Sequence, residues 1–356
     1  MNATLRQLLR DEILAHGPIS FARYMERALY EPDLGYYAAK TSRTGKAGDF
    51  ITNVTVGSCF GSLLASRIAE YWQELGAPNP FQLVEQGAND GQLMQDILEW
   101  LSDHNPECRK AAQVHFIEPL KSAQQAQATR CPEGTWHAAL PGEVGAHGVF
   151  FCNELLDAFP VQRFRRTRHG WAELYVALGD RGGSFCWQEK PAAQDAVKAL
   201  EMFFTQSPPE GYTTELTPGL EPWMKAAARL FAQGLWMITD YGLHAEEYYG
   251  SSRTQGTLRG YCKHQLWADD FLSSPGEIDL TCHVNWTTLV DRAPSLGLRV
   301  LDLRDQMRFL TALAVPTLKS IDNPDPKELR WLRQFQTLTH PAQLGAKFQT
   351  LQLIRE

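Results

Sequence analysis

One stretch decides the fold class of this chain: Leu83-Val84-Glu85-Gln86-Gly87-Ala88-Asn89-Asp90-Gly91. An apolar strand ends there in an acid, and a turn bounded by two glycines leads into a helix. Gly87 lets the backbone approach a ligand closely, while the turn amides and the N-terminus of the helix offer hydrogen-bond donors. A corner of this kind is typical of a doubly wound α/β sheet that binds a nucleotide or nucleoside at its edge.

Strands and helices alternate on both sides of this corner. Apolar residues recur with helical period in some segments, and short apolar runs bounded by turn residues separate these segments. The pattern predicts helices at 60–75, 92–101 and 122–129, and strands at 81–84, 114–117, 148–152 and 235–239. Such alternation indicates a mostly parallel sheet with helices on both faces.

Two parts of the chain depart from this alternation. Residues 1–60 are predicted as an N-terminal helical segment followed by a polar loop that covers the ligand. Residues 61–356 form the main domain, with an insertion or cover at about 160–234, where extended runs and proline-rich stretches interrupt the pattern. Further elements are expected after the last central strand, at 286–296, 299–303, 327–338 and 348–354.

Charge and cysteine content exclude several classes of function. A formal net charge of −7 opposes the phosphate contacts of nucleic-acid binding, so we expect no nucleic-acid partner. The seven cysteines include no C-x-x-C pair and indicate neither disulfides nor a metal site. No apolar run approaches the roughly 18 residues of a membrane span, and residues 1–16 contain acids, unlike a signal or transit peptide. We therefore expect a soluble cytoplasmic protein, without membrane insertion and of undetermined oligomeric state.

A second acid supports the ligand assignment. Glu118 ends the next predicted strand, 27 positions beyond Gly91, close to where such folds place an acid on a ribose diol. The turn lacks the full G-x-G-x-x-G that brings backbone against a pyrophosphate, which disfavours a nicotinamide dehydrogenase. S-Adenosylmethionine, a nucleoside without phosphate, fits better. In the alternative interpretation, both acids merely cap helices or turns.

Polar residues also follow two further strands. Asn153, Glu154 and Asp157 come after the strand at 148–152, and Asp240 ends the strand at 235–239. Because parallel strands present their carboxyl ends at one edge, we expect these four residues to face the site of transfer. Carboxylates there suit a cationic acceptor such as a guanidinium. The alternative is that Asp157 caps a helix and that Asn153 and Asp240 are turn residues.

Seven ordered motifs together are more specific than the glycine turn. The chain is similar in them to the MidA-like family of S-adenosylmethionine-dependent methyltransferases, which includes a mitochondrial complex I assembly factor. The motifs are Ile19-Ser20-Phe21, Gly48-Asp49-Phe50-Ile51-Thr52, the Glu85 turn, Asn153-Glu154-Leu155-Leu156-Asp157-Ala158-Phe159-Pro160, Asp240-Tyr241-Gly242, Gly256-Thr257-Leu258-Arg259-Gly260-Tyr261 and Pro275-Gly276-Glu277-Ile278-Asp279-Leu280-Thr281.

The resemblance implies a Rossmann-like class I methyltransferase fold with a seven-stranded sheet, and a protein arginine as the methyl acceptor of some members. From the positions of these motifs at strand ends and in the polar loop, we predict catalytic roles for Asn153, Glu154, Asp157 and Asp240, and cofactor binding by Gly48, Asp49, Phe50, Thr52, Glu85, Gly87, Gly91 and Glu118. Among the later residues, Glu277, Asp279 and His283 are further candidates for a proton acceptor, although a lone histidine is more often structural.

Three positions depart from the family pattern. Asn89 replaces a central glycine of the turn, although asparagine tolerates left-handed backbone angles. Thr55 and Asn285 stand where acids are common. These departures keep two alternatives to a protein methyltransferase open: an enzyme that methylates a small molecule, and a non-catalytic adenosylmethionine-binding assembly or scaffold protein.

Overall fold

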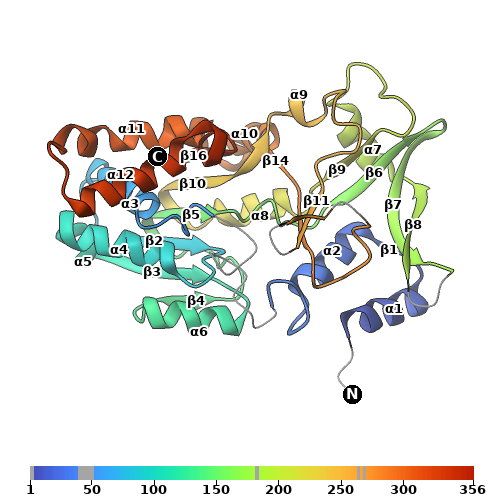
Figure 1. Cartoon of the computed structure of the whole chain (residues 1–356), viewed down its shortest axis with the longest axis horizontal. Helices are drawn as coiled ribbons and strands as arrows, with labels where there is room; N and C mark the ends of the chain where they lie inside the picture. Colours follow the sequence, from blue (N-terminus) through green and yellow to red (C-terminus); the bar gives the residue numbers. More distant parts are fainter. Residues whose placement is uncertain (1–3, 39–51, 181–183, 263–264, 268–269) are drawn as a thin grey trace.

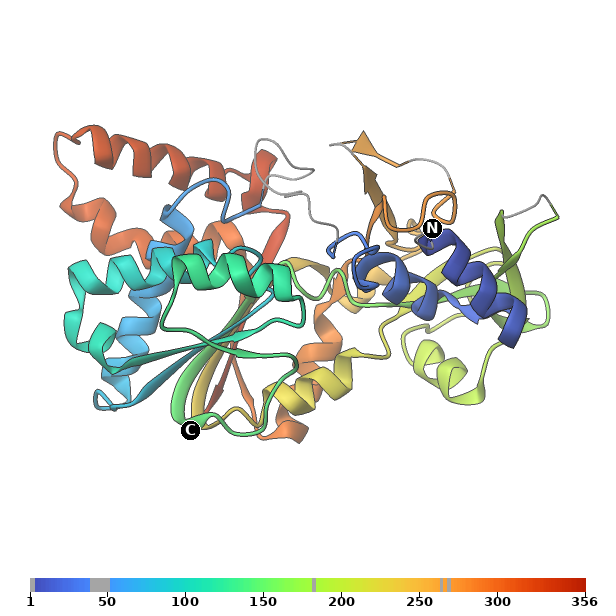
Figure 2. The same ribbon diagram turned by 90° about the horizontal axis from the view of Figure 1, so that it is seen from below.

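The computed structural model describes residues 4–38, 52–180, 184–262, 265–267 and 270–356. The chain forms two lobes that lie side by side (Figure 1). The larger lobe contains the central sheet and its covering helices. The smaller lobe contains the N-terminal helices and two further sheets, and a view from below shows the same division (Figure 2).

The central sheet has the strand order β15-β16-β10-β5-β2-β3-β4, and the short β14 pairs with the end of β10. Strands β4, β3, β2, β5 and β10 are parallel, whereas β16 is antiparallel to both of its neighbours. Within the described residues the sheet is therefore mixed, and the two-residue β14 is an eighth strand beside the seven that form its path. The strands are β2 (Phe81–Gln86), β3 (Ala112–Ile117), β4 (Thr135–His137), β5 (Gly145–Asn153), β10 (Phe231–Leu243), β14 (Val284–Asn285), β15 (Arg299–Asp305) and β16 (Phe348–Arg355).

Helices bury both faces of this sheet. Successive residues of β10 alternate between two cores, with Met237 packed on one side and Trp236 and Ile238 on the other. This two-sided burial explains why the central strands read as continuous apolar runs. The first face carries α3 (Cys59–Glu74), α4 (Gln92–His104), α11 (Gln306–Ser320) and α12 (Pro326–Thr339), and the second carries α8 (Leu220–Ala227), α10 (Trp286–Arg292) and η1 (Ala293–Leu296).

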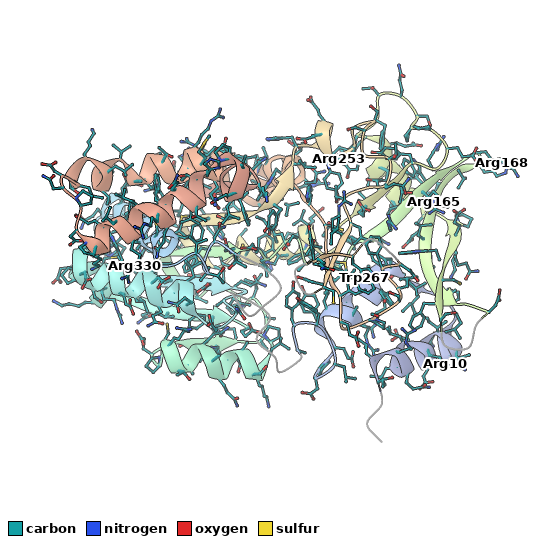
Figure 3. The ribbon with its side chains drawn as sticks, in the orientation of Figure 1. Arg10, Arg165, Arg168, Arg253, Trp267 and Arg330 are labelled. Atoms are coloured by element: carbon teal, nitrogen blue, oxygen red, sulfur yellow. The ribbon has the colours of Figure 1, made fainter. Side chains whose placement is uncertain are left out.

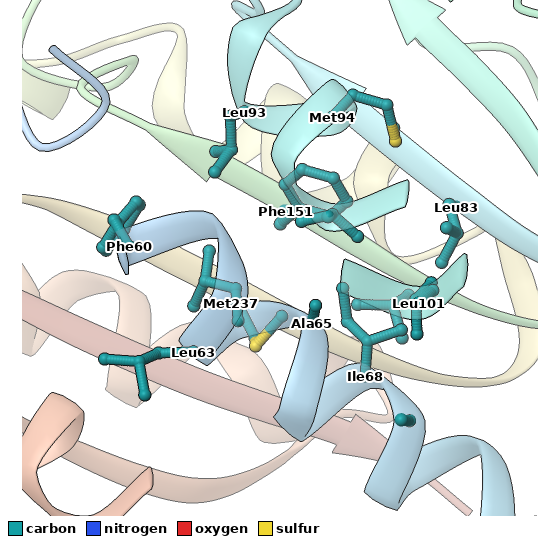
Figure 4. Packing of buried hydrophobic residues seen from close by; sticks show 14 of the residues in the cluster. Phe60, Leu63, Ala65, Ile68, Leu83, Leu93, Met94, Leu101, Phe151 and Met237 are labelled. Carbon is teal, nitrogen blue, oxygen red and sulfur yellow. The ribbon is translucent and has the colours of Figure 1, made fainter. Parts of the chain in front are cut away.

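Large side chains fill the first core. Phe60 and Leu63 of α3 and Phe151 of β5 are almost completely buried (Figure 4). The helices α5 (Pro106–Ala111) and α6 (Lys121–Arg130) complete the crossovers around β3. Since each crossover returns the chain to the same end of the sheet, the loops that follow β2, β3, β5 and β10 gather at one edge.

The smaller lobe is assembled from three separate parts of the sequence. Residues 4–38, 161–216 and 244–283 contribute to it, and one apolar cluster joins Leu9, Val176 and Leu280 from these three parts. Its elements are α1 (Leu5–His16), β1 (Ile19–Ser20), α2 (Phe21–Tyr30), β6 (Gln162–Thr167), β7 (Gly170–Leu178), β8 (Phe185–Pro191), α7 (Gln194–Glu201), β9 (Thr213–Leu216), α9 (Ala245–Tyr248), β11 (Arg259–Cys262), β12 (Gln265–Leu266) and β13 (Asp279–Thr281).

Two of the three arginines of β6 are paired with acids. Arg163 is buried and forms an ion pair with buried Glu215. Arg165 pairs at the surface with Glu189, and it lies with Arg168 at the outer end of the smaller lobe (Figure 3). The basic run therefore does not form one exposed cationic face. Among the described helices, none combines the length and the apolar character needed to cross a membrane.

Candidate active site

A cleft of about 2320 Å³ opens at the carboxyl edge of the central sheet and continues between the lobes. Glu85 and Glu118 line it from the larger lobe, and Tyr37 and Asp279 line it from the smaller one. The predicted residues Asn153, Glu154 and Asp157 also line it, from the loop that follows β5. The cleft therefore brings together residues from both ends of the chain.

The glycine turn has the backbone geometry that its sequence predicts. Gly87, Asn89 and Gly91 have positive φ angles of 74°, 48° and 84°. A Cβ atom at Gly87 would lie 3.0 Å from Leu155 Cδ1, and one at Gly91 would lie 3.2 Å from the Cα of Gln127. Asn89 adopts a left-handed conformation, which asparagine tolerates better than most residues.

Glu85 is a buried acid without a full set of partners. Its side chain is 3% exposed, and Oε2 has no hydrogen-bond partner among the described residues. Burial, together with the nearby charge of Asp90, raises the pKa of Glu85 to about 8. A buried carboxyl oxygen that faces a cleft without a partner fits a ligand that supplies a positive charge or a hydrogen-bond donor.

Glu118 is held in place by its own loop and by a residue that the sequence did not reveal. Its carboxylate accepts the backbone N–H of Leu120 at 2.9 Å and the side-chain amide of Gln127 at 3.3 Å. Gln127 also donates to the carbonyl of Asn89 at 2.9 Å and accepts from the indole of Trp136. Fully buried Gln127 thus links the glycine turn to the predicted ribose acid. Burial raises the pKa of Glu118.

Asp240 binds backbone rather than facing the cleft. Its Oδ2 accepts the N–H groups of Leu155, Leu156 and Asp157 at 3.0, 2.7 and 3.3 Å, and its Oδ1 accepts that of Tyr241 at 2.7 Å. Burial raises the pKa of Asp240 to about 7, and these four donors oppose that rise. Asp240 therefore fixes the loop that carries the other predicted catalytic residues.

Glu154 is held in an unusual backbone conformation. It has a φ of 53°, and its N–H donates to the carbonyl of Thr239. Its Oε1 accepts from the side-chain amide of Asn153 at 2.9 Å and from the backbone N–H of Asn53 at 3.4 Å. Burial raises the pKa of Glu154 to about 8, and the Asn153 amide opposes the rise. Positive φ in a non-glycine residue is a strain often found at functional sites.

Asp157 and Asp279 bring further negative charge into the cleft. Both are buried, and the hydroxyl of Tyr37 donates to Asp279 Oδ1 at 2.9 Å. Burial, followed by the charges of Asp240, Asp279 and Glu154, raises the pKa of Asp157 well above its usual value. Carboxyl groups crowded in this way repel one another when they are ionised, so a cation that offsets this repulsion binds favourably among them.

The remaining predicted residues differ in whether they line the cleft. Thr52 lines the cleft beside Thr55 and exchanges hydrogen bonds with it, while Gly48, Asp49 and Phe50 lie outside the described residues. Asn285 ends β14, immediately before helix α10, and does not line the cleft. His283 lines it, but its pKa is lowered to about 4 because burial and neighbouring arginines disfavour the cation. In the described part of the chain, no group of three or more metal-ligating side chains could hold a metal ion.

The chain is similar to proteins that are named as methyltransferases. Residues 63–303 match a family model described as "Putative S-adenosyl-L-methionine-dependent methyltransferase". The mitochondrial protein arginine methyltransferase NDUFAF7 of Danio rerio is 27% identical over 382 residues, 98% of this chain and 86% of the relative. The human protein of the same name is 25% identical over 383 residues, 98% of this chain and 83% of the relative.

A solved structure matches the whole fold. A COG1565 superfamily member from Burkholderia thailandensis, bound to S-adenosyl-homocysteine, has a TM-score of 0.85 and 28% identity. The similarity covers 99% of this chain and 92% of that protein. Both lobes therefore take part in the likeness.

The relatives contradict the expected cytoplasmic location. The similar proteins from Danio rerio, Drosophila melanogaster and Homo sapiens are mitochondrial. The cytoplasmic assignment was wrong because unpaired cysteines indicate a reducing environment, and that criterion does not distinguish one reducing compartment from another.

Proposed function

The chain belongs to the family of S-adenosyl-L-methionine-dependent methyltransferases whose model matches residues 63–303, and on this premise we propose that it methylates arginine in a protein partner. The observation that carries the proposal is the cleft itself. We call the part around Glu85 and Glu118 the cofactor end, and the part lined by buried carboxyl groups from both lobes the acceptor end.

The cofactor end fits S-adenosylmethionine, which supplies an activated methyl group when bound. The unpartnered oxygen of Glu85 and the carboxylate of Glu118 accept its hydrogen-bond donors. Gly87 and Gly91 put no side chain of their own on the turn, so the backbone there can lie close to the ligand. Thr52 borders the same cleft. These residues bind and orient the donor, and alignment of the reacting groups provides much of the acceleration in such a transfer.

The acceptor end suits a guanidinium. Glu154 and Asp157 present carboxylates that can hold the planar cation through paired hydrogen bonds. Asn153 orients Glu154, and Asp240 positions the loop that carries all three. When a guanidinium nitrogen accepts a methyl group it releases a proton, and Glu154 takes up that proton on a carboxylate oxygen. A carboxyl with a pKa of about 8 is well matched to this task near neutral pH.

The size of the cleft favours a protein over a small molecule. Sites for small molecules and cofactors usually have volumes of about 300–1,000 Å³, whereas this cleft has about 2320 Å³. The arginine-methyltransferase names of the relatives agree with this choice. We further propose that the smaller lobe covers the cofactor and forms the acceptor wall.

Binding and transfer assays test the proposal in sequence. Calorimetric titration with S-adenosylmethionine, S-adenosylhomocysteine and NADH should show binding of the two adenosyl compounds only. Transfer of labelled methyl from S-adenosylmethionine to an array of arginine peptides and matched lysine peptides should then mark arginine alone, and Asp157→Asn should abolish the signal. Binding without transfer to any peptide or protein extract would favour the non-catalytic assembly or scaffold protein instead.

A further inference from the structure

Three side-chain amides form a continuous hydrogen-bonded chain that ends on Glu154. Gln306 Nε2 donates to Asn53 Oδ1 at 2.8 Å, and Asn53 Nδ2 donates to Asn153 Oδ1 at 2.8 Å. Asn153 Nδ2 then donates to Glu154 Oε1 at 2.9 Å. We call Gln306, Asn53 and Asn153 the amide chain. Its members come from α11, from the turn before α3 and from the end of β5.

The direction of the amide chain is set at its far end. Gln306 Nε2 also donates to the backbone carbonyl of Leu338 at 3.0 Å, and a carbonyl can only accept. The amide nitrogen of Gln306 must therefore face Leu338 and Asn53. Each following amide then has its oxygen toward the previous residue and its nitrogen toward the next, so an N–H donor is delivered to Glu154.

Burial makes this orientation persistent. Gln306 and Asn53 are completely buried, where hydrogen bonds are stronger than in water and aligned donors polarise one another. Reversing any one amide would leave two oxygens facing each other and two buried groups without partners. Gln306 and Asn53 do not line the cleft, so they act on it only through Asn153 and Glu154.

We infer that the amide chain holds the Glu154 carboxylate in its working orientation, and that Gln306 and Asn53 are positioning residues for methyl transfer. The inference rests on the role proposed above for Glu154. It gives the helical hairpin of α11 and α12 a part in catalysis, because Gln306 begins α11 and Leu338 lies near the end of α12.

The charges around Glu154 determine the direction in which its pKa should move when the amide chain is broken. Asp240 and Asp279 raise its pKa, and the ionised carboxylate also interacts unfavourably with Asp157 and Tyr241. The Asn153 amide opposes these neighbours because it stabilises the charged form. Weakening the amide chain should therefore raise the pKa of Glu154 further.

Carbon-13 NMR of the full-length protein with labelled glutamate carboxyls measures this directly, with the Glu154 signal assigned by its loss in Glu154→Gln. Asn53→Ala should move the titration midpoint up by about one pH unit, because it removes the donor that orients Asn153 and so weakens the Asn153 hydrogen bond to the Glu154 carboxylate. Gln306→Met, which nearly conserves volume, should move it in the same direction by less. Gln336→Leu changes an exposed glutamine of α12 and is the matched control, with no shift expected.

The kinetic readout uses the arginine peptide marked in the array. Asn53→Ala should lower kcat about tenfold near neutral pH, with the affinity for S-adenosylhomocysteine within twofold of the parent. An unmoved midpoint in both Asn53→Ala and Gln306→Met would overturn the inference, and Gln306→Met alone decides if Asn53→Ala fails to fold. The titration needs no acceptor. A shifted midpoint in a protein that methylates no arginine would therefore overturn the proposed function and the catalytic role, while the amide chain itself would stand.

Discussion

Replacing Glu85 by glutamine should stabilise the ligand-free protein and weaken its cofactor binding. Glu85 is 3% exposed, and its pKa rises from 4.5 to about 8 because burial disfavours the ionised form. The native state therefore keeps a proton that the unfolded chain releases above pH 4.5. Stability from this group is complete below pH 4.5 and is lost as the pH rises toward 8.

The size of the effect follows from the two pKa values. Stability falls by about 1.4 kcal/mol for each pH unit across this window, which makes a loss of about 4 to 5 kcal/mol in total. A neutral glutamine escapes this loss. We expect Glu85→Gln to gain about 1 kcal/mol over the parent at pH 5 and about 4 kcal/mol at pH 8.

Urea unfolding at pH 5, 7 and 8 measures the predicted gain, and calorimetry with S-adenosylhomocysteine measures the loss of binding. Glu99→Gln, an exposed substitution on α4, is the control and should change neither quantity. The difference between the gain in stability at pH 5 and the gain at pH 8 is decisive, because the packing of the new amide contributes equally at both pH values. A gain that does not grow with pH would refute the reasoning, as would unweakened binding.

Three further substitutions test the turn, the core and the smaller lobe. Gly91→Ala should lower the free energy of unfolding by about 1 to 2 kcal/mol from left-handed strain alone, and calorimetry should show weaker binding of S-adenosylhomocysteine. Gly142→Ala, where a Cβ meets open space, should alter neither quantity. Phe151→Ala should lower the free energy of unfolding by about 3 to 5 kcal/mol in urea because it leaves a cavity; a loss below 1 kcal/mol would contradict the packing. Arg163→Met should lose a similar amount because it leaves Glu215 charged and buried, and limited proteolysis should then cut the smaller lobe first.

Local patterns were sufficient for the elements around the glycine turn. The predicted strand at 81–84 and helix at 92–101 correspond to β2 and α4, because two-sided burial and a glycine-bounded turn leave clear signals in a short window. Helix α11 was not predicted, and Pro316 lies inside it, where proline usually ends a helix. Strand β8 was also missed, since every residue in it except Phe185 is partly or fully exposed and its apolar side chains do not form a strand-like run.

The residues of the site also include some that local sequence patterns predict and some that they do not. That Glu85, Glu118 and the residues 153–157 lie together at the cleft could be predicted, because each lies at or just after the end of a strand and parallel strands bring their carboxyl ends to one edge. Gln127 gave no such signal, since it lies in the middle of a polar helix and shows its role only through contacts with Asn89 and Glu118. The sequence could not reveal that Asp240 accepts four backbone N–H groups and does not line the cleft.

The sequence by itself determined the α/β class, the glycine turn and the acids at the strand ends, because these depend on periodicity and on residues close to one another in the chain. Only the tertiary structure decided that three distant segments build one lobe, that β16 enters the sheet antiparallel, and that Gln306 contacts Asn53 across 253 positions. Such contacts depend on which surfaces meet when the cores close. The sequence around a polar side chain does not indicate which distant residue it will contact there.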